Sequence, residues 1–119
     1  MAVAIRIYSS GAPEVMQLEE LDLPLPGPGE VLLEQTAIGV NPLDVNQRKG
    51  LVPIALPSGL GLEGAGTVAA VGSGVSGLKS GDRVGYATGP LGAYASVRLF
   101  PADRLIRLPD SLADDAAAS

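Results

Sequence analysis

Apolar and polar side chains alternate along several short stretches of the chain, which is the period of a strand with one face buried. The N-terminal residues Ala2–Tyr8 show this alternation, and so do Val15–Leu23 and Glu30–Val40. The segment Pro24–Gly29 is built mostly of proline and glycine, which neither a helix nor a central strand accommodates. We therefore expect three strands, with a rigid loop before the longest of them.

A glycine-dense region from Gly59 to Val84 contains two apolar segments, Thr67–Val71 and Arg83–Gly85. Each interior glycine destabilises a helix by about 1 kcal/mol relative to alanine, so a helix is disfavoured here. Glycine also supplies the positive-φ and close-approach positions that tight connections between strands need. The region is predicted as a strand, an elaborate turn and a second strand.

Two stretches of this region, Gly59–Gly64 and Gly72–Gly77, match the spacing G-x-G-x-x-G. A dinucleotide-binding fingerprint lies between a strand and a helix whose N-terminus faces the pyrophosphate. The first match is followed by a strand-like run, and Gly81-Asp82 follows the second too closely for a helix to develop. We interpret both as structural turns. Further along, Ala93–Phe100 and Arg104–Leu108 are predicted as two more strands.

One helix is marked by its terminal residues. Asn41 is a favourable N-cap, Pro42 suits the first helical position, and the carboxylate of Asp44 falls at the third, near the positive end of the helix. Gly50 is a plausible C-terminal stop. The pattern predicts a helix over Pro42–Lys49, and capping alone would account for both Asn41 and Asp44.

Many short strands, glycine and proline turns and one or two small helices indicate a mainly β fold, a barrel or a sandwich. The 119 residues are enough for one domain with a core of its own. Ser111, with Asp114 three positions later, predicts the start of a second helix shortly before Ser119.

Composition excludes several kinds of chemistry. The chain contains no cysteine and no histidine, so it offers no thiolate nucleophile, no sulfur-ligated zinc and no imidazole base. No acidic loop has ligand spacing for a metal ion. A net charge of -5 and an aromatic content of 3% disfavour a nucleic-acid surface. No apolar run approaches the roughly 20 residues of a membrane span, so a cytoplasmic protein without a membrane partner is expected.

Five groups of motifs stand in a particular order along the chain: Gly11–Val15; Ala37–Asp44; Leu56–Gly66; Val71–Val75 with Gly81–Val84; and Leu91–Val97. Together they resemble the N-terminal catalytic domain of the medium-chain dehydrogenase/reductase superfamily, most nearly its zinc-independent quinone oxidoreductase branch. The resemblance covers essentially the whole chain. It implies a GroES-like, partly open β-barrel.

What the resemblance implies about function is specific. Residues 1–119 would be the catalytic domain of a two-domain reductase, truncated before the Rossmann domain that binds most of NADPH. The complete protein, expected to be a homodimer, would transfer a hydride to a quinone or an α,β-unsaturated carbonyl compound. The domain alone would be inactive, because the cleft needs both walls.

Zinc-dependent relatives carry a cysteine at or beside the position of Asn41 and a histidine at that of Leu62. The resemblance therefore implies no metal, so that hydrogen bonds polarise the acceptor. It assigns Asn41, Asp44 and Arg48 to catalysis, and Asn41, Pro42 and Asp44 to cofactor binding.

Other polar residues fit this pattern less well. Glu63 is either an orienting group behind the cleft or a buried structural hydrogen-bonding residue. Tyrosines that are frequent in the family are replaced here by Asn46 and Val52, which leaves the proton to water or to the second domain. Tyr94, in the predicted strand Ala93–Phe100, is interpreted as a core residue.

Two other function classes stay open at this stage. The alternative to an enzyme domain is a non-catalytic GroES-like binding or assembly module, since no convincing catalytic acid or base is present. A small nucleic-acid-binding β-barrel is disfavoured by charge and ring content.

Overall fold

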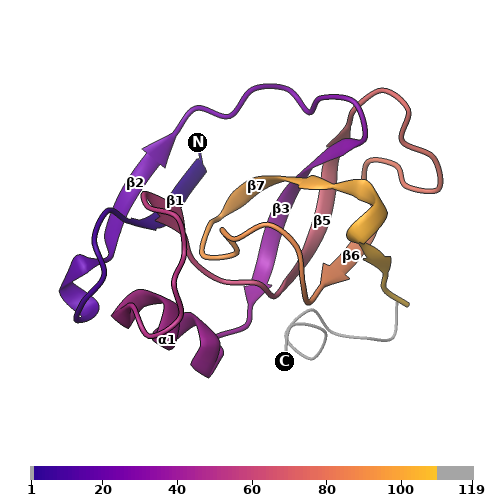
Figure 1. Cartoon of the computed structure of the whole chain (residues 1–119). Helices are drawn as coiled ribbons and strands as arrows, with labels where there is room; N and C mark the ends of the chain where they lie inside the picture. The colour runs from indigo at the N-terminus through magenta and orange to yellow at the C-terminus, as the bar shows by residue number, and fades with distance from the viewer. Residues whose placement is uncertain (1, 110–119) are drawn as a thin grey trace.

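The computed structural model describes residues 2–109, and these residues form two antiparallel sheets and one α-helix (Figure 1). The smaller sheet has the strand order β2-β1-β4, and the larger one β7-β3-β5-β6-β8. The strands are β1 (Ala2–Ile7), β2 (Gln17–Leu21), β3 (Glu30–Ile38), β4 (Ser58–Gly59), β5 (Gly64–Val71), β6 (Arg83–Tyr86), β7 (Val97–Pro101) and β8 (Ile106–Arg107). The helix α1 spans Pro42–Lys49, and two 3-10 turns, η1 and η2, span Pro13–Val15 and Ala102–Arg104.

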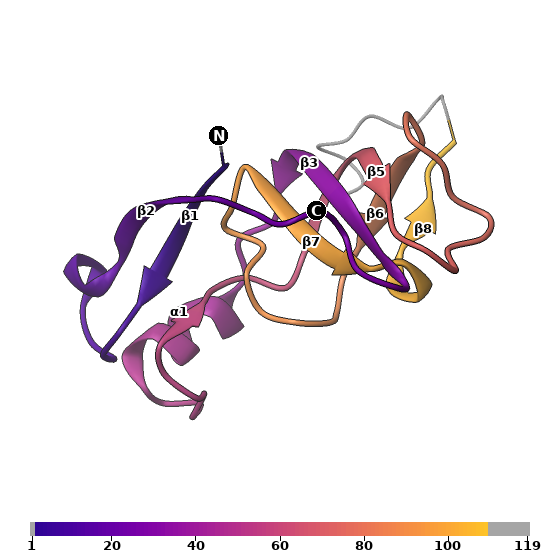
Figure 2. The ribbon, with the colours of Figure 1, turned by 90° about the horizontal axis from the view of Figure 1, so that it is seen from above.

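The mainly β prediction is confirmed. The two sheets form a partly open structure, because β7 and β8 stand at opposite edges of the larger sheet. Figure 2 shows β1, β2 and α1 toward one side of the molecule and the larger sheet toward the other. Within residues 2–109, no helix has the length and apolarity to cross a bilayer. The helix predicted to begin at Ser111 lies outside the described residues.

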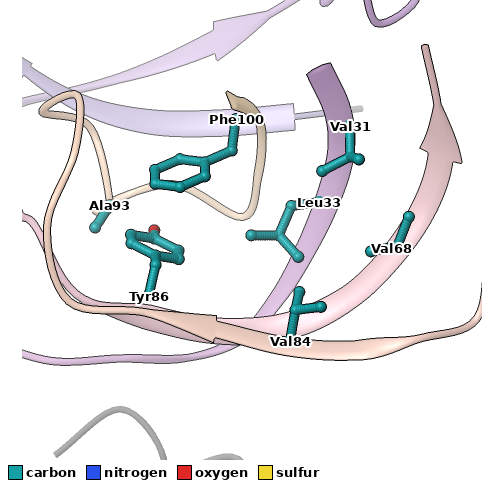
Figure 3. Close-up of a cluster of buried hydrophobic side chains, with 7 residues drawn as sticks. All are labelled: Val31, Leu33, Val68, Val84, Tyr86, Ala93 and Phe100. Atoms are coloured by element: carbon teal, nitrogen blue, oxygen red, sulfur yellow. The ribbon is translucent and has the colours of Figure 1, made fainter. Parts of the chain in front are cut away.

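The core lies on the inner face of the larger sheet, where side chains from four strands meet (Figure 3). Phe100 and Leu33 are fully buried, and the ring of Phe100 lies 4.2 Å, centroid to centroid, from that of Tyr86. The remaining members of this cluster are Val31, Val68, Val84 and Ala93. Burial of each large apolar side chain contributes about 1.5–3 kcal/mol.

Two strand predictions need correction at their ends. The strand β5 begins at Gly64, three residues earlier than predicted, because glycines there allow β3 and β5 to approach closely. A side chain on Gly66 would collide with the carbonyl oxygen of Glu34. The predicted strand Ala93–Phe100 is regular only from Val97, and its first half is a loop that meets β1 in an isolated bridge at Ala95.

The predicted strands Val15–Leu23 and Arg104–Leu108 begin in the 3-10 turns η1 and η2, and the remaining strand predictions differ from the structure only at their ends. The two G-x-G-x-x-G stretches lie in strands and turns, as predicted. Gly61, Gly74 and Gly77 have positive φ angles of 95°, 77° and 83°.

Candidate functional site

Helix α1 begins and ends at the residues that its capping signals predict. Asn41 is extended at the N-cap, and Gly50 closes the helix in the left-handed conformation with φ 87°. The carboxylate of Asp44 accepts a hydrogen bond from the backbone N–H of Asn41 at 3.0 Å. The capping role expected for Asp44 is therefore confirmed, and it fixes the helix N-terminus at the end of β3.

Asp44 does more than cap the helix. The residue is only 2% exposed, and its Oδ2 accepts a second hydrogen bond, from the hydroxyl of Tyr94, at 2.8 Å. Its other oxygen, Oδ1, is buried and has no hydrogen-bond partner among the described residues. A buried acceptor without a partner costs about 1–3 kcal/mol. This carboxylate therefore retains capacity for one further donor.

Tyr94 is the residue that sequence reasoning placed wrongly. It is half-buried in the loop before β7, outside the main core cluster, and its hydroxyl faces Asp44. Burial raises the pKa of Tyr94, and the hydrogen bond to Asp44 raises it further, while the Arg48 charge opposes both effects. The hydroxyl therefore keeps its proton through the physiological range.

A glycine provides the space for the ring of Tyr94. A Cβ on Gly61 would lie 2.7 Å from Cδ1 of Tyr94. The glycines at positions 89 and 92, both with positive φ, were a signal that this segment turns before the strand begins. No local signal indicated that the hydroxyl would meet a carboxylate fifty positions away.

Arg48 is buried, with only 8% of its surface exposed. Its Nη1 donates to the carbonyl oxygen of Gly11 at 2.7 Å, and the N–H of Gly11 donates to the Arg48 carbonyl at 2.8 Å. This reciprocal pair fastens the last turn of α1 to the loop that follows β1.

The side chain of Asn41 points toward the segment before β5. Its Nδ2 lies 3.5 Å from Oε2 of Glu63, at the limit of a hydrogen bond, and the Glu63 carbonyl accepts the N–H of Gly39 at 3.0 Å. Both interactions connect the end of β3 to the start of β5. Pro42 is exposed beside Asn41.

These residues surround a cleft of about 320 Å³. Its wall is mostly apolar, with Asp44, Arg48 and Tyr94 as its polar members, and the other lining residues are Pro13, Met16, Val40, Val45 and Leu60. A second, larger cleft of about 450 Å³ follows the face between β1 and the end of β3. Val40 and Tyr94 line both clefts and so mark their boundary.

The structure thus brings Asp44 and Arg48 to one cleft and leaves Asn41 and Pro42 beside it. No cluster of three or more carboxylates that could hold a metal ion occurs in the described part of the chain. What the arrangement offers is a half-apolar surface with hydrogen-bonding groups at fixed positions, as in small-molecule sites generally.

Residues 27–110 match the family model described as alcohol dehydrogenase GroES-like domain. The chain is 48% identical over 120 residues to a quinone oxidoreductase of Pseudomonas aeruginosa, covering 100% of this chain and 37% of that protein. It is 42% identical over 116 residues to a 2-haloacrylate reductase of a Burkholderia species, covering 94% of this chain and 35% of the relative.

The solved structure of an Escherichia coli quinone oxidoreductase complexed with NADPH superimposes with a TM-score of 0.94. That protein shares 45% of its aligned residues, and the alignment covers 98% of this chain and 36% of the other. The chain therefore spans little more than a third of the length of these relatives.

Proposed function

This chain belongs to the alcohol dehydrogenase GroES-like domain family, and from that premise we propose that it is the N-terminal catalytic domain of a zinc-independent, NADPH-dependent reductase. Its substrate is a quinone or an α,β-unsaturated carbonyl compound, and the remaining wall of the active site belongs to a second, cofactor-binding domain. The similarity to quinone oxidoreductases, one of them in complex with NADPH, supports this assignment.

The observation that carries the proposal is the state of Asp44. Its carboxylate is buried beside an apolar cleft, anchors the helix N-terminus and Tyr94 through Oδ2, and keeps Oδ1 unpaired. A capping role alone would explain neither the cleft beside Asp44 nor the lack of a hydrogen-bond donor to Oδ1. A ligand hydroxyl or a water molecule entering the cleft would supply the donor that Oδ1 lacks.

The residues present fit the nicotinamide end of a dinucleotide. Pro42 and Val40 are exposed apolar residues suited to the edge of a ring, with Val40 73% exposed. The amide of Asn41 and the carboxylate of Asp44 are suited to ribose or carboxamide groups. NADPH, when bound, supplies the hydride for reduction of the acceptor. We assign the phosphates of NADPH to the second domain.

The chain's own residues hold and polarise the acceptor. Among residues 2–109, the Nδ2 of Asn41 is engaged only by a long contact to Glu63, so it can donate to a carbonyl oxygen at little cost. A fixed donor aimed at an oxygen that gains negative charge stabilises the transition state without a metal. Arg48 contributes by position, because it holds α1 against the loop at Gly11.

The test is NADPH oxidation by the complete natural polypeptide that contains this chain, with a benzoquinone and a cyclic enone as acceptors. We expect turnover that a chelator does not reduce. Asn41→Ala is expected to lower kcat/KM by about 100-fold, the usual effect of removing one such donor. Asn46→Ala, on the same helix, is the matched control and should retain parental activity.

Absence of turnover with either acceptor would contradict the proposal and favour the binding-module alternative. Turnover abolished by the chelator would refute the zinc-independent assignment alone. Equal losses in the Asn41 and Asn46 variants would refute the role given to Asn41.

A further inference from the structure

The segment that carries Tyr94, residues 90–95, is held by backbone hydrogen bonds on two sides. The N–H groups of Gly92 and Ala93 both donate to the carbonyl of Gly61, at 3.1 and 3.2 Å, and that of Tyr94 donates to Leu60 at 2.9 Å. On the opposite side, the N–H of Ile5 in β1 donates to the carbonyl of Tyr94 at 2.8 Å. These bonds fix the middle of the segment.

A buried arginine fixes its beginning. Arg98, in β7, is 7% exposed, and its Nη2 donates to the carbonyl oxygens of Pro90 at 2.9 Å and Leu91 at 3.3 Å. Its Nη1 donates to the hydroxyl of Tyr86 at 3.1 Å. Among residues 2–109, no carboxylate lies within ion-pair distance of this guanidinium.

Two aromatic rings also lie beside the guanidinium group of Arg98. The guanidinium carbon lies 4.8 Å from the ring centroid of Phe100 and 5.4 Å from that of Tyr86, and Figure 3 shows these two rings facing each other in the core. The hydroxyl of Tyr86 in turn donates to Gln35, whose Nε2 donates to the carbonyls of Ala93 and Ala95. The network therefore contacts both ends of the segment.

A buried charge that has no carboxylate partner in the described part of the chain is costly in a core, because desolvation opposes it and an apolar side chain would pack there without that penalty. A planar guanidinium, however, can bind several carbonyl oxygens in fixed directions at once. The contacts of Arg98 use that property on two consecutive carbonyls of one loop.

We propose that Arg98 is a positioning residue of the candidate site, which holds the loop at Pro90 and Leu91 and so places the Tyr94 hydroxyl against Asp44. The loop passes close to β4 at this point, since a Cβ on Gly59 would lie 2.8 Å from the Cα of Gly92. Arg98 lines neither of the clefts that Tyr94 lines, but a third one of about 240 Å³, so any effect it has on the candidate site passes through the loop. The inference does not depend on which reaction the protein catalyses.

The test follows the ionisation of Tyr94 in the complete polypeptide, by NMR of isotope-labelled tyrosine Cζ. The Tyr94→Phe variant assigns the signal. The Arg98→Lys variant keeps the positive charge but loses the planar guanidinium group that contacts both loop carbonyls. In this variant the Tyr94 hydroxyl should move away from Asp44 and into water. Loss of the hydrogen bond to Asp44 and greater exposure to water both lower the pKa of Tyr94. We therefore expect about a tenfold higher ratio of tyrosinate to tyrosine at a given alkaline pH.

Arg98→Met is the second variant, because it buries no charge beside the two rings and so avoids the main risk of misfolding. It should change the Tyr94 signal in the same direction. Arg107→Lys is the control, as Arg107 is exposed and its ion pair is with Asp82; its Tyr94 should titrate as in the parent. An unchanged Tyr94 titration in a folded Arg98 variant would overturn the proposal.

Discussion

Replacement of Tyr94 by phenylalanine removes one hydroxyl and leaves the ring in place over Gly61. The lost hydrogen bond, 2.8 Å long, ends on a carboxylate that is 2% exposed, so water cannot readily replace it. Of its hydrogen bonds within residues 2–109, the Asp44 carboxylate would keep the one from the N–H of Asn41. Hydrogen bonds to charged groups contribute about 1.5–3 kcal/mol, and we expect the free energy of unfolding to fall by that amount at neutral pH.

The pH dependence of this loss has a definite sign. Burial and the Asp44 hydrogen bond raise the pKa of Tyr94 in the folded chain above its ordinary value of about 10. Below that value both states are protonated, and the stabilisation is fully present. Above it the unfolded chain loses the proton first, so the unfolded state is favoured as pH rises. The difference between parent and Tyr94→Phe should therefore be constant near neutrality and shrink above about pH 10.

Urea unfolding followed by circular dichroism measures both quantities. Tyr8→Phe is the matched control, since its hydroxyl donates to Glu19 on an exposed surface and should contribute less. In an Asp44→Ala background, the Tyr94→Phe exchange should lose most of its effect. The proposed contribution of the Tyr94 hydroxyl would be refuted by equal losses of unfolding free energy in the Tyr94 and Tyr8 variants. A difference between parent and Tyr94→Phe that grows above pH 10 would refute it as well.

Two further variants test the scaffold of the site. Gly66→Ala places a methyl group against the Glu34 carbonyl where β3 pairs with β5, and it should lower the melting temperature strongly or prevent folding. The control Gly85→Ala meets only ordinary contacts and should be tolerated. Similar melting temperatures for the two variants would contradict the close approach of β3 and β5. Arg48→Met frees the loop at Gly11 from α1 and should accelerate limited proteolysis within residues 9–15, which Lys49→Met should not; equal cleavage rates would argue against the clamp.

Local signals predicted the helix well, because capping depends on a few adjacent residues. Asn41, Pro42 and Gly50 define its ends without help from the rest of the fold. The start of β5 was missed for the opposite reason. Gly64 and Gly66 suggest a turn locally, yet they are strand residues. A side chain at either position would collide with β3.

The candidate site was only partly accessible from sequence. The family resemblance assigned Asn41, Asp44 and Arg48 to the site, but it could not show that Arg48 is buried on Gly11 or that Asp44 holds Tyr94. Those contacts join residues 37 and 50 positions apart. Arg98 gave no signal either, since an arginine in an alternating strand suggests a solvent-facing position, whereas here it shares the inner face with Phe100.

The central claim is that the N-terminus of α1 and the Tyr94 loop form the face where cofactor and acceptor meet. Hydrogen–deuterium exchange of the complete natural polypeptide, with and without NADPH, tests it most directly. We predict slower exchange of backbone amides within residues 40–46 and 92–96 when NADPH is bound, with those of β8 unaffected. Protection confined to segments outside this chain would contradict it.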